Sequence, residues 1–183
     1  QIDELKAWWK DNGRLVILTV VVVAVVLAGF QGWRTYRHTQ SLAAVALYEQ
    51  LEQAERAGDR KKVADIAGEI VAKHAATPYA AFAALSAARL SYEGRDLAQA
   101  KARLAWVVEN ARREELRDVA RLRLAGVLLD EKDHDEALKL LEAKPTEAMT
   151  GLYADLRGDI LLAQGKGAEA RSAYKLALDR SEA

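Results

Sequence analysis

The sequence contains no cysteine, only two prolines and only two phenylalanines among its 183 residues. Without cysteine there can be no disulfide and no thiolate metal site, although this fits the cytoplasm and the periplasm equally well. The chain has 36 alanines instead, and with so few prolines such a composition favours helices over strands. The predicted fold class is all-α.

An excess of charge of one sign is also missing. The formal net charge is zero, and from Ser41 onward 22 lysines and arginines stand against 24 aspartates and glutamates. A protein that binds DNA or RNA usually carries a basic field that attracts phosphates. The charge balance therefore argues against a nucleic-acid partner.

The motifs of common enzymes are absent from the sequence. No serine lies in a GxSxG context, no glycine-rich phosphate loop occurs, and the three histidines are far apart. The acidic residues 130–136 lack the glycine and the spaced glutamate of a calcium loop, and Asp133 or Asp135 would instead cap the next helix. We expect no enzyme activity, cofactor, metal or small-molecule substrate. A small metal-dependent hydrolase is the alternative from a different functional class.

One long apolar run is present. Residues 15–33 carry no charge, and as a helix they would span roughly 28 Å, close to the hydrocarbon thickness of a bilayer. We predict a transmembrane helix over 15–33, with a buried core helix or a cleaved signal peptide as alternatives. Aromatic and basic residues flank the run as interfacial anchors, and they are Trp8, Trp9, Arg14, Trp33, Arg34, Tyr36 and Arg37.

The segments beside this helix have separate predicted roles. Residues 1–14 form a short amphipathic leader, which is an interfacial anchor or a docking helix, and residues 34–40 form a juxtamembrane linker. Three basic residues before the run against two after it favour a cytoplasmic N-terminus. Within the run, Ala24, Ala28 and Gly32 recur every four residues and are candidates for contact with another membrane helix.

Residues 41–183 form the repeat domain. Apolar residues recur there at helical spacing in eight segments, one of them over residues 135–143, and short polar or glycine-containing turns separate the segments. Small residues recur at intervals of 37 and 33 in two series, which are Ala88, Ala125, Gly158 and Ala100, Ala137, Ala170. Leu104, Leu141 and Tyr174 follow the second series by four residues. These periods are close to the roughly 34 residues of a tetratricopeptide repeat, so we predict a tetratricopeptide-like helical-hairpin solenoid of about four hairpins.

The first helices of stacked hairpins line a concave face that suits an extended peptide or a partner helix. In the repeat register, the side chains on this face are Phe82, Leu85, Arg89, Tyr92, Leu122, Leu129, Asp155 and Asp159. We predict that they bind a protein partner, with burial between repeats as the alternative for the apolar members. The set lacks the lysines and asparagines that would hold a C-terminal carboxylate.

Three segments resemble a known family. They are the leader ending in KDNGR, the valine-rich run followed by GWRTYR, and the C-terminal ADLRGDILLAQGKGAEARSAY. Together they are similar to the tetratricopeptide-like ancillary subunits of the bacterial Sec translocon, the YfgM-like family. The resemblance implies a single-pass inner-membrane protein with a cytoplasmic N-terminus and a periplasmic repeat domain. It also implies association with the SecYEG channel and with a PpiD-like membrane-anchored chaperone, and it implies no catalytic residues.

The predicted function is a membrane-anchored scaffold or chaperone adaptor that binds these partners, and emerging clients, through the helical-repeat surface. The single anchor would confine the domain to the membrane surface, where a co-anchored partner has a high effective concentration. A membrane-tethered repeat scaffold for envelope assembly or cell division is the alternative. Only the identity of the partner separates these two functions.

Overall fold

The computed structural model describes the backbone of residues 2–181, and before Ile17 it describes the side chains of Trp9 and Arg14 alone. The chain divides into two compact units, Gln1–Ala43 and Ala44–Ala183. The described residues form eight α-helices and one short 3-10 helix, with no strand among them. The all-α prediction is confirmed.

The first unit contains the apolar run, which belongs to helix α1 (Ile2–Arg56). In the described part of the chain this is the one helix long and apolar enough to cross a membrane, and its most apolar stretch of 18 residues has a mean hydropathy of 1.8. None of its apolar window is buried in the structure, whereas the core helix of a soluble protein is mostly buried. Val25, for example, is 67% exposed, and in a bilayer lipid would cover such side chains.

Residues 34–40, the predicted juxtamembrane linker, are helical and belong to α1. The segment contains no proline or glycine, and its hydroxyl groups donate hydrogen bonds to carbonyl oxygens of the preceding turn, so nothing in it ends the helix. Thr35 Oγ1 lies 3.0 Å from the Gln31 oxygen, and Ser41 Oγ lies 3.0 Å from the Arg37 oxygen. No break in secondary structure therefore marks this segment.

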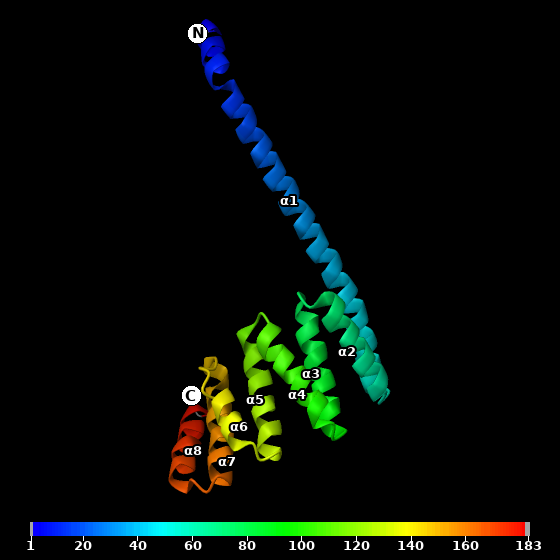
Figure 1. Cartoon of the computed structure of the whole chain (residues 1–183), viewed down its shortest axis with the longest axis vertical. Helices are drawn as coiled ribbons and strands as arrows, with labels where there is room; N and C mark the ends of the chain where they lie inside the picture. The colour runs from blue at the N-terminus through cyan, green and yellow to red at the C-terminus, as the bar shows by residue number, and fades with distance from the viewer. Residues whose placement is uncertain (1, 182–183) are drawn as a thin grey trace. The chain divides into compact units, whose positions relative to one another are not determined.

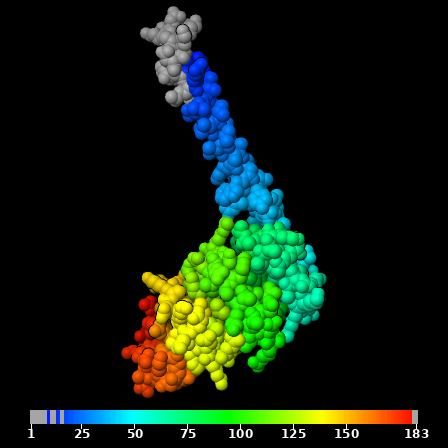
Figure 2. Space-filling model, in the orientation of Figure 1, coloured from blue at the N-terminus to red at the C-terminus, as the bar shows by residue number. Residues whose placement is uncertain are grey.

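The second unit is a series of helical hairpins. It contains the end of α1 and then α2 (Arg60–His74), α3 (Pro78–Glu93), α4 (Leu97–Asn110), α5 (Glu114–Asp130), α6 (His134–Leu140), η1 (Glu147–Met149), α7 (Thr150–Ala163) and α8 (Gly167–Ser181). Consecutive helices lie side by side in chain order and form four hairpins (Figure 1). The space-filling view shows the same order as a progression of colours from cyan to red (Figure 2). The predicted hairpin architecture is confirmed.

Local sequence determines several helix ends. The carboxylates of Asp59 and Asp96 accept hydrogen bonds from the amides of Lys62 and Gln99, each at 3.0 Å, and so cap α2 and α4. Pro78 occupies the first turn of α3, where its missing N–H leaves no helical bond unmade. These residue types sit where the sequence pattern changes from one apolar segment to the next.

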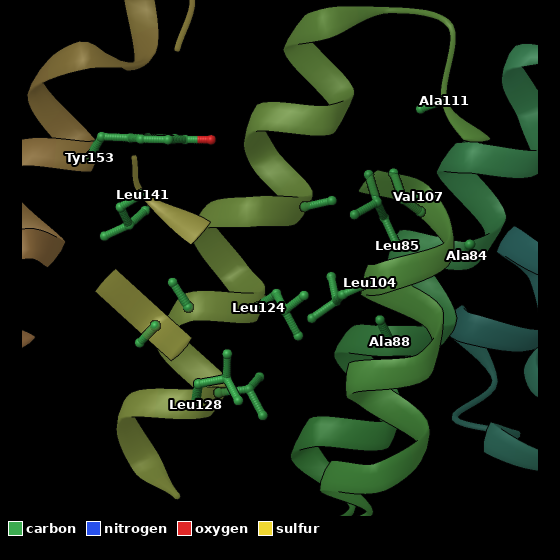
Figure 3. Packing of buried hydrophobic residues seen from close by; sticks show 14 of the residues in the cluster. Ala84, Leu85, Ala88, Leu104, Val107, Ala111, Leu124, Leu128, Leu141 and Tyr153 are labelled. Atoms are coloured by element: carbon green, nitrogen blue, oxygen red, sulfur yellow. The ribbon is translucent and has the colours of Figure 1, made fainter. Parts of the chain in front are cut away.

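The small residues of the two repeat series lie where helices pack most closely. Ala100 and Ala137 are 0% exposed and Ala170 is 1% exposed. Larger side chains fill the spaces between them, and Figure 3 shows Leu104 of α4 next to Leu124 of α5. This is the close-packed arrangement that alternating small and large residues allow.

The last hairpin uses a different pair of residues at the same place. A Cβ on Gly158 would lie 2.4 Å from Cε1 of Tyr174, so the tyrosine ring occupies the space that any side chain at position 158 would need. The repeat register pairs Gly158 with Tyr174 where the preceding repeats pair alanine with leucine. A larger residue in one helix is therefore matched by a smaller residue in the other.

Helix α6 is shorter than expected. It ends at Leu140 rather than at residue 143 and has 7 residues, whereas α4 has 14. Leu141 turns into the core, where it is 6% exposed, and the amide of Thr146 donates a 2.8 Å hydrogen bond to Asp118 Oδ2. The chain leaves the helical path because these two contacts with α5 hold the following loop.

Candidate protein-binding groove

A groove of about 460 Å³ lies between α3 and α5. Three of the eight predicted partner-binding residues line it, namely Arg89, Tyr92 and Leu129. The other lining residues are Ala88, Leu104, Arg123, Gly126, Val127 and Asp130. The structure thus brings part of the predicted set together in one place, which we call the α3–α5 groove.

The groove depends on the absence of a side chain at Gly126. The repeat register places Gly126 where the neighbouring first helices carry Arg89 and Asp159. A Cβ at Gly126 would meet no other atom within 4 Å, so open space lies in front of this residue. The sequence contains a signal for this groove, because a glycine stands where the adjacent repeats carry a charged side chain.

Polar groups flank an apolar floor. The Tyr92 hydroxyl donates a hydrogen bond to the Asp130 carboxylate, and this bond raises the pKa of Tyr92. Arg89, which also lines the groove, forms an ion pair with Glu55 of α1, with Nη2 3.3 Å from Oε1. Such a mixture of apolar surface and charged rim suits a peptide or helix whose apolar side chains are flanked by polar ones.

Two of the remaining predicted residues lie elsewhere in α3. Phe82 packs towards α1, with its ring centroid 6.3 Å from that of Tyr48. Leu85 is only 7% exposed and belongs to the main core, so the expectation that it lies on the binding face is wrong. The reason is that α3 lies between two neighbouring hairpins, which cover it from both sides.

The other predicted residues lie on α5 and α7, outside the groove. Leu122 is half-buried against the core. Asp155 is exposed, and Asp159 accepts a 2.8 Å hydrogen bond from the Tyr174 hydroxyl within its own hairpin. Their role in partner binding stays a prediction.

Comparison with known proteins identifies the relatives of the chain. Residues 6–183 match the family model described as a tetratricopeptide repeat-like domain. A Haemophilus influenzae protein named "Ancillary SecYEG translocon subunit" is 30% identical over 177 residues, which cover 97% of this chain and 86% of that protein. The chain belongs to the ancillary SecYEG translocon subunit family. An Escherichia coli protein of the same name is 29% identical over 175 residues, or 96% of this chain and 84% of that protein. No solved structure matches the chain.

In this member of the ancillary translocon subunit family, the predicted anchors are exposed where their side chains are described. Trp9 is 51% exposed and Arg37 lies over the ring of Trp33, while the side chain of Trp8 lies outside the described residues. The small residues Ala24, Ala28 and Gly32 are also exposed along α1, and their contact with another membrane helix stays a prediction. The remaining exposed anchors are Arg14, Arg34 and Tyr36.

The sequence prediction missed a buried polar cluster in this family member. Asp118 is 0% exposed, and it accepts hydrogen bonds from Arg121 Nη1 at 3.0 Å and from the Thr146 amide at 2.8 Å. The Tyr153 hydroxyl lies 3.1 Å from the Asp118 carbonyl oxygen and 3.3 Å from Oδ1. Burial, and then the negative charge of Asp118, raise the pKa of Tyr153 to about 12. The cluster joins α5, the loop after α6 and α7, and the one signal for it was an acidic residue within an apolar series.

A second groove lies between α7 and α8. Leu138 of α6 packs against the cluster that contains Leu161 and Ala173. The groove there has a volume of about 410 Å³, and its lining includes Ala154, Arg157, Leu161, Ala173 and Leu176.

The acidic turn before α6 has structural contacts. Asp130 binds Tyr92, Asp133 is the N-cap residue of α6, and Asp135 Oδ1 accepts a 2.9 Å hydrogen bond from Gln164. Among the residues that the structure describes, no three histidine, aspartate or glutamate side chains form a group that could hold a metal ion.

Proposed function

We propose that the chain is a membrane-anchored protein-interaction scaffold that associates with the SecYEG channel and uses its α3–α5 groove to bind a protein partner. The association is supported by the names of the relatives, which are ancillary SecYEG translocon subunits. The groove supports the binding role because it combines Tyr92 and Leu129 with exposed charges at its rim. A PpiD-like membrane-anchored periplasmic chaperone is the proposed occupant, and emerging clients are further candidates.

The groove can be closed without changing the core. Gly126→Phe places a ring in the open space at Gly126, where a Cβ meets no atom within 4 Å. Gly68→Phe in α2 is the matched control, because a Cβ at Gly68 also meets nothing within 4 Å but lies outside the groove. Both variants keep their helices if these positions are open, which circular dichroism checks.

Affinity purification of the full chain from detergent-solubilised membranes tests the proposal. We expect the wild type and Gly68→Phe to retain channel subunits and a periplasmic chaperone, and Gly126→Phe to lose most of the chaperone. If no channel subunit co-purifies with the wild type, the translocon association is wrong. If Gly126→Phe captures the chaperone as well as the control does, the groove is not its binding site.

The proposed topology has a cytoplasmic N-terminus and a periplasmic repeat domain. Because the chain has no cysteine, a single Lys166→Cys substitution in the exposed turn before α8 creates a unique label site. We expect a membrane-impermeant maleimide to label it from the periplasmic side. Labelling from the cytoplasmic side alone would reverse the topology.

A repeat scaffold for envelope assembly or cell division is the second candidate, supported by the same groove and anchor. It predicts that the wild type captures other membrane-bound partners and no channel subunit. The metal-dependent hydrolase predicts tight binding of a divalent metal, which isothermal titration calorimetry measures.

A further inference from the structure

A cationic face on α1 directly follows the apolar run. With about 100° of rotation per helical residue, six side chains share one side of the helix over an arc of roughly 140°. They are Phe30, Trp33, Arg34, Arg37, His38 and Ser41, and they line one hollow on this helix. The face therefore passes from apolar through aromatic to cationic along the chain.

One of the two arginines is held in place. The Arg37 Cζ atom lies 4.7 Å from the centroid of the Trp33 ring, a cation–π arrangement that restricts the guanidinium group. The Ser41 hydroxyl donates its hydrogen to the Arg37 carbonyl oxygen at 3.0 Å, so it is not the donor for a ligand. The donors on this face are the side chains of Arg34, Arg37 and His38 and the indole N–H of Trp33.

The charges of this face are not balanced by acidic residues of the same helix segment. An arginine on a helix commonly pairs with a carboxylate three or four residues away, as Arg56 does with Glu52 at 3.3 Å near the end of α1. Around Arg34 and Arg37 this is impossible, because the sequence contains no aspartate or glutamate between Asp11 and Glu49. A ligand with a negative charge would therefore balance the positive charges of Arg34 and Arg37.

The position of the face relative to the apolar run selects the kind of ligand. The uncharged run ends at Trp33, so Arg34, Arg37 and His38 follow within about one and a half helical turns, the depth at which lipid phosphates lie. Phe30 and Trp33, which are 58% and 56% exposed, precede them on the hydrocarbon side. Guanidinium groups match phosphate oxygens well because they donate two parallel hydrogen bonds.

We infer that this face is a binding site for the headgroup of an anionic phospholipid. Arg34 and Arg37 donate hydrogen bonds to the phosphate oxygens, and the rings of Phe30 and Trp33 lie against the glycerol and the start of an acyl chain. The leader differs from this face, because Asp3, Glu4 and Asp11 there equal its three basic residues in number. A lipid of negative charge therefore prefers the C-terminal flank of the membrane helix.

Native mass spectrometry of the full chain in detergent, after incubation with equal amounts of phosphatidylglycerol and phosphatidylcholine, tests the site. We expect the wild type to retain phosphatidylglycerol preferentially and Arg34→Gln/Arg37→Gln to lower this retention by about fivefold for each arginine removed. Both side chains are exposed and glutamine is a good helix former, so helicity should be unchanged.

Lys6→Gln/Arg14→Gln is the matched control, because it removes the same charge from the other flank. We expect it to retain phosphatidylglycerol within about twofold of the wild type, which is well under the fivefold loss expected for one arginine of the site. The inference would be overturned if the control lost as much phosphatidylglycerol as Arg34→Gln/Arg37→Gln. It would also be overturned if Arg34→Gln/Arg37→Gln retained as much of this lipid as the wild type, or if the wild type did not prefer it over phosphatidylcholine. Displacement of the lipid by inorganic phosphate, but not by chloride of equal ionic strength, would assign the face to free phosphate instead and also overturn it.

Discussion

The second helices of two neighbouring hairpins, α4 and α6, are held against the next helix by different kinds of contact. Helix α4 is 14 residues long and covers α5 with apolar side chains such as Leu104 and Val107. Helix α6 has 7 residues, and the loop that follows it is attached to α5 and α7 through the polar cluster of Asp118, Thr146 and Tyr153. Where a helix is shortened, hydrogen bonds of a buried carboxylate replace part of the lost apolar contact.

This difference has a consequence for stability. When an apolar contact loses a single group, the free energy of unfolding decreases by a small step. When a buried carboxylate and its partner are separated by a substitution, the group that remains is buried without a hydrogen-bond partner, which costs more. The C-terminal half of the repeat domain should therefore depend strongly on very few residues. Four sets of substitutions test this comparison.

The largest effect is expected for Asp118→Ala. It frees the Thr146 amide and removes one of the two carboxylates that pair with Arg121, which keeps Glu114 at 2.8 Å, so we expect a loss of about 2–4 kcal/mol in the free energy of unfolding. Urea unfolding of the full chain in detergent, followed by circular dichroism, measures it. Asp130→Ala is the exposed control and should cost under about 1 kcal/mol. A loss for Asp118→Ala as small as that of the control would mean that the loop is held by other contacts.

The second test concerns the close packing of the last hairpin. Gly158→Ala brings a Cβ to 2.4 Å from the Tyr174 ring, and we expect it to destabilise the chain by about 1–3 kcal/mol. Adding Tyr174→Leu recreates the alanine and leucine pair of the preceding repeats and should recover most of that loss. Gly68→Ala, which meets no atom within 4 Å, should instead stabilise α2 by up to about 1 kcal/mol. Additive effects of Gly158→Ala and Tyr174→Leu in this double-mutant cycle would show that the two residues are not coupled.

The third test uses the pH dependence of stability. The pKa of Tyr153 is about 12 in the folded chain against 10 in the unfolded chain, so between these values the unfolded state has released a proton that the folded state keeps. Stability contributed by Tyr153 is present below pH 10 and falls as the pH rises towards 12, by up to about 1.4 kcal/mol per pH unit. Tyr153→Phe should show a correspondingly weaker loss in urea unfolding over this range. The same pH slope in both proteins would mean that other groups cause the loss.

The smallest effect is expected at the helix caps. Asp96 accepts a hydrogen bond from the Gln99 amide at 3.0 Å, whereas Asp133 makes no capping hydrogen bond through its side chain. Asp96→Ala should therefore destabilise the chain by about 1 kcal/mol, and Asp133→Ala by only a few tenths, roughly. Thermal unfolding of the two variants side by side compares α4 with α6. Equal effects would show that α6 is capped in solution as well as α4 is.

Much of the fold followed from short-range patterns in the sequence. The alanines at positions 100, 137 and 170 predicted where hairpins pack, because a small residue is needed wherever two helices approach closely. The apolar run predicted a helix long and apolar enough to cross a membrane, and the structure has such a helix there. The candidate groove was predicted in part, since Arg89, Tyr92 and Leu129 lie in it but Leu85 is in the core.

What the sequence by itself determined is the number and order of the helices of the repeat domain, because capping residues, turns and apolar periodicity act within a few neighbouring positions. The end of α6, the burial of Leu85 and the bond between Tyr92 and Asp130 were decided only by the tertiary structure. Each depends on groups far apart in the chain, and Asp118 and Thr146, for example, are 28 residues apart. Such contacts exist only after the hairpins have stacked, so no local pattern encodes them.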